Sequence, residues 1–291
     1  MALLPALRAA ALGIALALCV ACPGTKPKEA AMAQAPVRIV LLHHSTGGEI
    51  WKGGVAPFFD AWNAEHGTRY VITEQDYPHT KGTHPRLGRL LPARVFNRLF
   101  RDHYPWENYP YDYWNLWVAH QGASRDRSEP NLDDLAKSFD VIVFKHCFPV
   151  SSIRADDGAP SVSSRTKTLA NYKLQYEALK ARMHQFPDRT FIVWTGPALT
   201  EASTRPEDAA RAREFAAWVK DVWDEKGDNI YVWDFRELET DGGPFLVPGR
   251  SVGAGDSHPS PEFSKRVAPL LGRRIVDVIE GRGDGSSLTG R

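Results

Sequence analysis

The sequence has little of what would mark several classes of protein. It contains three cysteines in 291 residues, and only Cys147 lies beyond residue 22, so no internal disulfide is available to the mature domain. Its 36 basic and 35 acidic side chains give a formal net charge of +1, which argues against nucleic acid as a partner. The remaining composition, with 43% hydrophobic residues, is that of a globular chain of one or at most two domains.

The N-terminal segment resembles an export signal. An apolar stretch over Ala9–Ala21 follows Arg8 and is too short to span a bilayer. It leads into Cys22 in a sequence that resembles a bacterial lipoprotein cleavage box, while a cut after Ala33 is the alternative. We therefore predict a signal peptide at 1–21, a lipid on Cys22 and a tether at 22–36. The protein would then be exported and held in the bacterial envelope, facing the periplasm or the cell exterior. The lipid would be its only link to a membrane.

Five short apolar runs carry strand signals. They are continuous and rich in β-branched or aromatic residues, as strands buried on both faces should be. These runs are 37–42, 70–72, 141–144, 191–194 and 230–233. Their alternation with amphipathic segments predicts a three-layer α/β/α domain with a mostly parallel sheet of about five strands.

Three helices are predicted in the second half of the chain. One apolar stripe runs over 169–186, and a second helix begins at Thr204 with Val222 among its inward-facing residues. The last helix begins at Ser260, and Pro269 inside it predicts a bend or a break. The domain is thus expected to span 37–280, with a disordered tail at 281–291.

Three side chains have the types that serine catalysis requires. A serine hydroxyl becomes a nucleophile when an imidazole takes its proton and a carboxylate orients that imidazole. Ser45 follows the first predicted strand, in a glycine turn at the strand's carboxyl end, where ligands bind in open α/β sheets. Asp256 and His258 lie roughly two hundred residues further on, just before the last helix. If the two ends of the domain meet, the chain is a serine hydrolase.

The order of these parts resembles the SGNH, or GDSL-like, hydrolase family over nearly all of residues 37–280. The resemblance implies a flavodoxin-like sheet and hydrolysis of an ester by Ser45, His258 and Asp256, without a cofactor. Gly122 stands where the family has its oxyanion glycine.

Two departures from the family pattern bear on the reaction. The Gly-x-Asn of the third family block is absent, and Lys145-His146-Cys147 stands in its place. Lys145 or His146 could supply the missing donor to an oxyanion, while Cys147 is interpreted as a buried thiol ending a strand. One residue separates Asp256 from His258 where the common pattern has two, a spacing that resembles the polysaccharide O-acetyltransferase branch.

An aromatic-rich insertion is expected at about 78–118, and its aromatics either line a cleft for sugar rings or an acyl group, or pack as a small core. These aromatic residues are Tyr104, Trp106, Tyr109, Tyr111, Tyr113, Trp114 and Trp117. Asp112 and Asn115 would be available to hydroxyl groups in the first case. Of the adjacent His43 and His44, strand alternation makes one structural and leaves the other, His44, as a candidate for the site.

A metal site is the main rival to the serine mechanism. Several side chains of suitable chemistry are present, but none shows a dedicated ligand spacing, so we predict no metal. They are His44, Asp76, His79, His84, His146 and Asp256.

The sequence therefore favours an exported, monomeric serine esterase or O-deacetylase acting on ester-bearing glycans or small esters. An O-acetyltransferase with the same three residues is one alternative. A non-catalytic glycan-binding lipoprotein, favoured by the missing asparagine, is the other.

Overall fold

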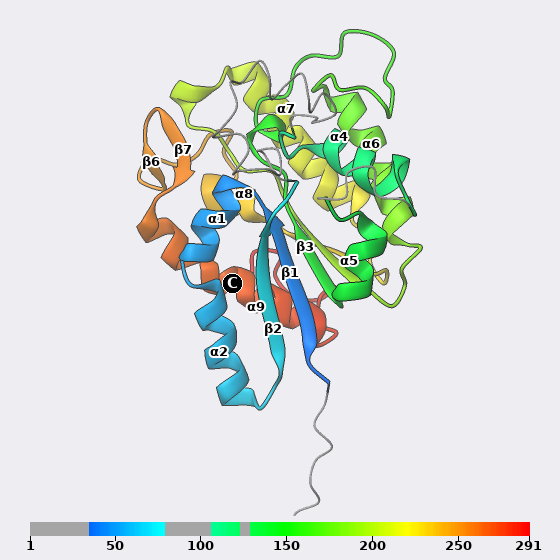
Figure 1. Cartoon of the computed structure of the whole chain (residues 1–291). Helices are drawn as coiled ribbons and strands as arrows, with labels where there is room; N and C mark the ends of the chain where they lie inside the picture. The colour runs from blue at the N-terminus through cyan, green and yellow to red at the C-terminus, as the bar shows by residue number, and fades with distance from the viewer. Residues whose placement is uncertain (1–34, 79–105, 123–128) are drawn as a thin grey trace, which may run out of the picture. The chain divides into compact units, whose positions relative to one another are not determined.

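The structure is a computed structural model that describes residues 35–78, 106–122 and 129–291 (Figure 1). Its central sheet has five parallel strands in the order β2-β1-β3-β4-β5. The strands are β1 Val37–His43, β2 Tyr70–Asp76, β3 Val141–Phe144, β4 Thr190–Trp194 and β5 Ile230–Trp233. This is the flavodoxin-like order, and it confirms the predicted α/β fold. Cys22 and the whole predicted signal segment lie outside the described residues.

Strand burial follows position in the sheet. The side chains of β3 are all buried, because β1 and β4 flank it and helices cover both its faces. The strand β2 has a neighbour on one side only, and its Val71 is 51% exposed. The prediction of a strand buried on both faces is thus wrong for β2.

Helices cover both faces of the sheet (Figure 1). One face packs against α4 Pro110–Tyr113, the π-helical turn η1 Trp114–Ala119, α5 Leu132–Ser138, α6 Leu169–Met183, α7 Pro206–Trp218 and the π-helical turn η4 Val219–Trp223. The other face packs against α1 Ser45–Lys52, α2 Val55–His66, α8 Phe235–Thr240 and α9 Pro261–Ile279. The described residues also form two 3₁₀ helices, η2 Phe148–Val150 and η3 Glu201–Ser203. An antiparallel hairpin consists of β6 Ser251–Gly253 and β7 Asp256–Pro259. In the described part of the chain, no helix has the length and apolarity to cross a bilayer.

The helices differ from the sequence expectations at three points. Helix α7 begins at Pro206 with Arg205 in the cap position, rather than at Thr204. Val222 is 62% exposed, because the π-helical turn shifts the register and turns Trp223 into the core instead. Helix α9 runs without a break through Pro269.

The aromatic segment belongs to the main core. Tyr109, Tyr113 and Trp117 are fully buried and pack with aromatic side chains of β3 and α6. Asp112 is also buried, and its carboxylate accepts the backbone N–H groups of Glu107 and Asn108, each at 2.8 Å. These residues therefore hold the fold together, and Asp112 is not available to a substrate hydroxyl. Tyr104 lies outside the described residues.

The last eleven residues, for which composition predicts disorder, pack back onto the domain. The Arg274 guanidinium donates to the Gly283 carbonyl and, at 2.8 Å, to the Ser286 hydroxyl. The Asp234 N–H donates to the carbonyl of Leu288 at 2.8 Å, next to the end of β5. Backbone contacts of this kind are not visible in a Gly- and Ser-rich composition.

Candidate active site

Ser45 stands at the carboxyl end of β1, where it begins α1. It is exposed, and the preceding His44 has the extended conformation of a helix cap. The neighbouring strands β2 and β3 lie on opposite sides of β1, so Ser45 sits at the point where the strand order reverses. Gly47 permits this tight entry, because a Cβ there would lie 2.4 Å from the Cβ of His43.

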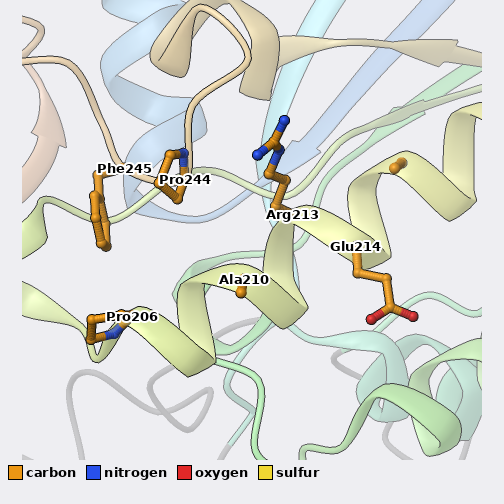
Figure 2. A pocket seen from close by; sticks show the side chains of 7 residues that line it. Pro206, Ala210, Arg213, Glu214, Pro244 and Phe245 are labelled. Atoms are coloured by element: carbon orange, nitrogen blue, oxygen red, sulfur yellow. The ribbon is translucent and has the colours of Figure 1, made fainter.

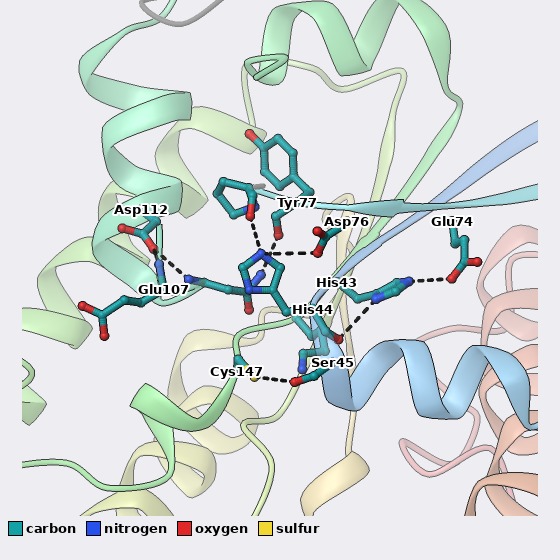
Figure 3. Close-up of polar contacts among 12 residues, drawn as sticks. His43, His44, Ser45, Glu74, Asp76, Tyr77, Glu107, Asp112 and Cys147 are labelled. Carbon is teal, nitrogen blue, oxygen red and sulfur yellow. Dashed lines mark hydrogen bonds and ion pairs between the residues drawn. The ribbon is translucent and has the colours of Figure 1, made fainter. Parts of the chain in front are cut away.

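Cys147 brings the end of β3 to the same place. Its sulfur lies 3.5 Å from the Ser45 hydroxyl oxygen (Figure 3). Burial raises the pKa of the thiol, but Lys145, the Ser45 hydroxyl and the backbone N–H groups of Phe148 and Thr46 outweigh it, so the net pKa is lowered. The prediction of a buried thiol at a strand end is confirmed, whereas its contact with Ser45 carried no signal in the sequence.

Asp256 and His258 form a hydrogen-bonded pair on β7. The His258 ring Nδ1 and the Asp256 carboxylate are 2.6 Å apart, and the His258 backbone N–H donates to the same oxygen at 3.0 Å. These two bonds lower the pKa of Asp256. With Nδ1 bound to the carboxylate, Nε2 is the ring nitrogen left to exchange a proton.

The one-residue spacing of this pair has a local cause. Successive side chains of a strand point to opposite faces, so residues two apart share a face. Ser257, between them, is buried and accepts the N–H of Thr200 at 3.0 Å. The spacing thus follows from placing the pair on a strand.

The two ends of the domain do meet at this edge of the sheet. Helix α1 packs against β7, and the rings of Phe148 and His258 are in edge-to-face contact at 5.1 Å. Phe148 directly follows Cys147, which contacts Ser45. The Ser45 hydroxyl is hydrogen-bonded to Cys147 and not to His258, and such catalytic bonds often tighten only when a substrate is bound.

Both histidines before Ser45 are buried and bind elsewhere. The His44 ring hydrogen-bonds through Nε2 to the Pro78 carbonyl and lies 3.6 Å from the Asp76 carboxylate (Figure 3). Burial lowers the pKa of His44 to about 4, so it is uncharged at neutral pH. His43 lies 2.9 Å from Glu74 on β2. Neither ring hydrogen-bonds to Ser45.

The structure does not bring Gly122 or His146 to Ser45 as donors. The Gly122 N–H donates to the Asp133 carboxylate at 2.8 Å, so it is already occupied. The His146 ring packs against Tyr113 and Tyr176 in the aromatic core, with ring centres 4.7 and 5.4 Å away, and burial lowers its pKa to about 3. Gly122 and His146 were expected to be donors because of their positions in the sequence, but sequence position does not determine the direction of an N–H group or a ring.

Lys145 lies beneath the Ser45 turn rather than in it. Its side chain is 1% exposed, and its Nζ makes no hydrogen bond. Its Cδ would be 3.1 Å from a Cβ at Gly47, and its charge acts on Cys147 and on the buried Glu239. Lys145 can therefore influence the site electrostatically without contacting a substrate.

No three metal-ligating side chains converge within residues 35–78, 106–122 and 129–291. His44 lies near Asp76, His146 is enclosed by aromatic rings, and Asp256 is paired with His258. His79 and His84 lie outside the described residues.

We expect Gly47→Ala to damage both the fold and the site. The new Cβ would lie 2.4 Å from the Cβ of His43, which the strand holds in place, so α1 must move and carry Ser45 with it. Overpacking of this kind costs about 1–3 kcal/mol of the free energy of unfolding, and it would also displace the Ser45 hydroxyl. Gly48→Ala is the matched control, because its nearest neighbour is a ring atom 3.4 Å away. Equal stability of the two variants in urea would contradict this packing.

The buried Glu239 carboxylate makes stability depend on pH. Burial raises the pKa of Glu239 to about 8 from an ordinary 4.5, so the folded state retains a proton that the unfolded state releases. Its contribution is complete below pH 4.5 and decreases by roughly 1 kcal/mol per pH unit up to about pH 8. Glu239→Gln should flatten the free energy of unfolding across this range. Urea titrations of both proteins at pH 5 to 9 test this, and parallel curves would contradict it.

Comparison with family models, with curated proteins and with solved structures gives no match to this chain.

Proposed function

We propose that this chain is a serine hydrolase that cleaves ester bonds. The observation that carries the proposal is that α1, which begins at Ser45, packs against β7, which holds the hydrogen-bonded Asp256–His258 pair. The two parts come from opposite ends of the domain and converge at the switch point of the sheet.

The proposed reaction follows from the chemistry of the three groups. Nε2 of His258 takes the proton of the Ser45 hydroxyl, and the oxygen attacks the ester carbonyl to give an acyl-enzyme and an alcohol. A water molecule, activated by His258, then releases the acyl group. Asp256 fixes the ring through the 2.6 Å bond and stabilises its charged form.

Backbone groups are the best donors to the oxyanion. The Ser45 N–H lies at the N-terminus of α1, where the first N–H groups of a helix have no carbonyl partner within it, whereas the Thr46 N–H already faces the Cys147 sulfur. Fixed donors of this type stabilise the negative charge that develops on the carbonyl oxygen. The Ser45 N–H takes the place of the Gly122 N–H, which binds Asp133.

Two pockets lie near the β6–β7 hairpin, but Ser45, Asp256 and His258 do not line them. A pocket beside the β6–β7 hairpin is lined by Leu246, Val247 and Val252, together with residues 200–202. It shares Pro244 and Phe245 with a second pocket along α7, where Arg213 and Glu214 stand (Figure 2). The proposed substrates are small esters and the acyl esters of glycans, as the resemblance of the sequence to the hydrolase family implies.

The same residues would serve an O-acetyltransferase that passes the acyl group to a sugar hydroxyl. The one-residue spacing of Asp256 and His258 resembles that of O-acetyltransferases, but the position of both residues on strand β7 is sufficient to explain it. A non-catalytic binding protein is favoured by one contact, that of Ser45 with Cys147 rather than with His258.

The proposal is tested with the purified protein on a short-chain chromogenic ester and on an O-acetylated polysaccharide. We expect alcohol and free acid to be released from the ester. Acetate that appears on an added acceptor sugar, rather than in solution, would identify a transferase. No turnover of either substrate by the folded protein would contradict the proposal and favour a binding protein.

A further inference from the structure

We propose that Cys147 is a modification site beneath Ser45, at which a peroxide or another small electrophile reacts and forms an adduct that blocks the serine. The reactivity of the thiol is independent of the proposed function. Only the blocking of ester hydrolysis rests on that function.

Ser45 and Cys147 lie so close together that a reagent can reach both from the same side. Ser45 is exposed, whereas Cys147 is 7% exposed and lies next to it, with sulfur and hydroxyl oxygen 3.5 Å apart (Figure 3). A reagent of a few atoms that enters at Ser45 therefore meets the sulfur next. Any atom bonded to that sulfur would stand against the serine hydroxyl, because the two atoms are already in contact.

The buried Lys145 ammonium interacts with this sulfur, and burial lowers the pKa of that ammonium while Cys147 and Glu239 raise it. Lys145 is 1% exposed, its Nζ makes no hydrogen bond, and its positive charge acts on Cys147. The backbone N–H groups of Thr46 and Phe148 also face the sulfur. The thiolate is the nucleophilic form of cysteine, and cations and helix N-termini are what stabilise it.

The other titratable groups around Lys145 and Cys147 carry little charge at pH 7. Burial lowers the pKa of His43, His44 and His146, so these three are neutral at pH 7. Glu239 of α8 is an acid whose charge would act on Lys145, and its pKa of about 8 keeps it mostly protonated at pH 7. His258 of β7 borders the site through Phe148 and is bonded to Asp256.

The chemistry of the step is balanced without a metal or cofactor. The thiolate attacks one peroxide oxygen, an S–O bond forms and the O–O bond breaks. Sulfur loses two electrons to the peroxide, and the departing hydroxide takes a proton to become water. Cys147 is a free cysteine, so one external thiol would displace water from its sulfenic acid to form a mixed disulfide, and a second thiol would then release the Cys147 thiol.

The test measures the labelling of Cys147 in the full chain by peptide mass spectrometry, which separates it from Cys19 and Cys22. Hydrogen peroxide and methyl methanethiosulfonate are the probes, applied from pH 5.5 to 9. We expect the rate to reach half its maximum below the value of about 8.5 for a free cysteine. Lys145→Met should lower the rate at pH 7 about tenfold, since the thiolate loses its cation. If Lys145→Met does not fold, the pH dependence of the Cys147 labelling rate in the natural protein is sufficient to test the proposal.

The activity of the labelled protein is measured on the chromogenic ester. We expect it to decrease in proportion to the labelled fraction and to return with dithiothreitol. The proposed modification site would be wrong if Cys147 were labelled only after denaturation, or if its labelling rate had the pH dependence of a free cysteine. Full labelling with undiminished hydrolysis would overturn the blocking and leave the proposed function intact. Normal labelling of a protein without ester turnover would support the thiol site while the proposed function fails.

Discussion

Ser45→Ala should lower the rate of ester hydrolysis at least about a thousandfold, because removing a serine nucleophile leaves only binding and oxyanion stabilisation. Ser45 is exposed at the start of α1, so the loss of one oxygen should leave the free energy of unfolding nearly unchanged. The measurement is the turnover of a short-chain chromogenic ester, together with urea unfolding of both proteins.

Two further variants identify the nucleophile. Ser138→Ala, at the exposed end of α5, is the control for a serine lost elsewhere and should retain full turnover. Cys147→Ala tests the sulfur that lies 3.5 Å from Ser45. If Ser45→Ala retains turnover while Cys147→Ala abolishes it, the nucleophile is the cysteine and our assignment is wrong.

His258→Ala should have an effect of the same size as Ser45→Ala, because residues that act as one unit lose their function together. Asp256→Asn should reduce turnover about 100- to 10,000-fold, because the neutral amide no longer stabilises the charged ring and can donate its NH2 to Nδ1, which favours the wrong tautomer of His258. Initial rates of ester hydrolysis measure both.

Ser257→Ala is the control that lies between these two residues. Its hydroxyl faces the other side of β7 and accepts the N–H of Thr200, so its loss should affect stability by about 1 kcal/mol and leave turnover intact. A loss of turnover in Ser257→Ala as large as that in His258→Ala would mean that the hairpin, rather than the pair, is needed.

The sheet could be predicted because its signals are local. Four of the five strands are continuous apolar runs, and the structure places each of them within a residue or two of the predicted limits. The edge position of β2 could not be predicted, since it depends on which strands pair. The exposure of Val222 depends on a π-helical turn that shifts the register by one residue, and amphipathic periodicity assumes no such shift.

In the candidate site, too, features with local signals could be predicted and features that depend on tertiary contacts could not. Ser45, Asp256 and His258 could be chosen because their side-chain types and their places beside a strand and a helix restrict the chemistry. The directions of Gly122 and His146 depend on tertiary contacts, namely the carboxylate of Asp133 and the aromatic rings of the core. The contact of Cys147 with Ser45 joins residues 102 apart in the chain, so only the pairing of β1 with β3 reveals it.

The most direct test of the serine assignment is covalent labelling with an organophosphonate probe, which reacts preferentially with an activated serine, followed by peptide mass spectrometry. The account predicts one adduct per molecule, on Ser45, and loss of that adduct in His258→Ala. No adduct on the folded natural protein, or an adduct on Ser45 that forms equally well without His258, would contradict it.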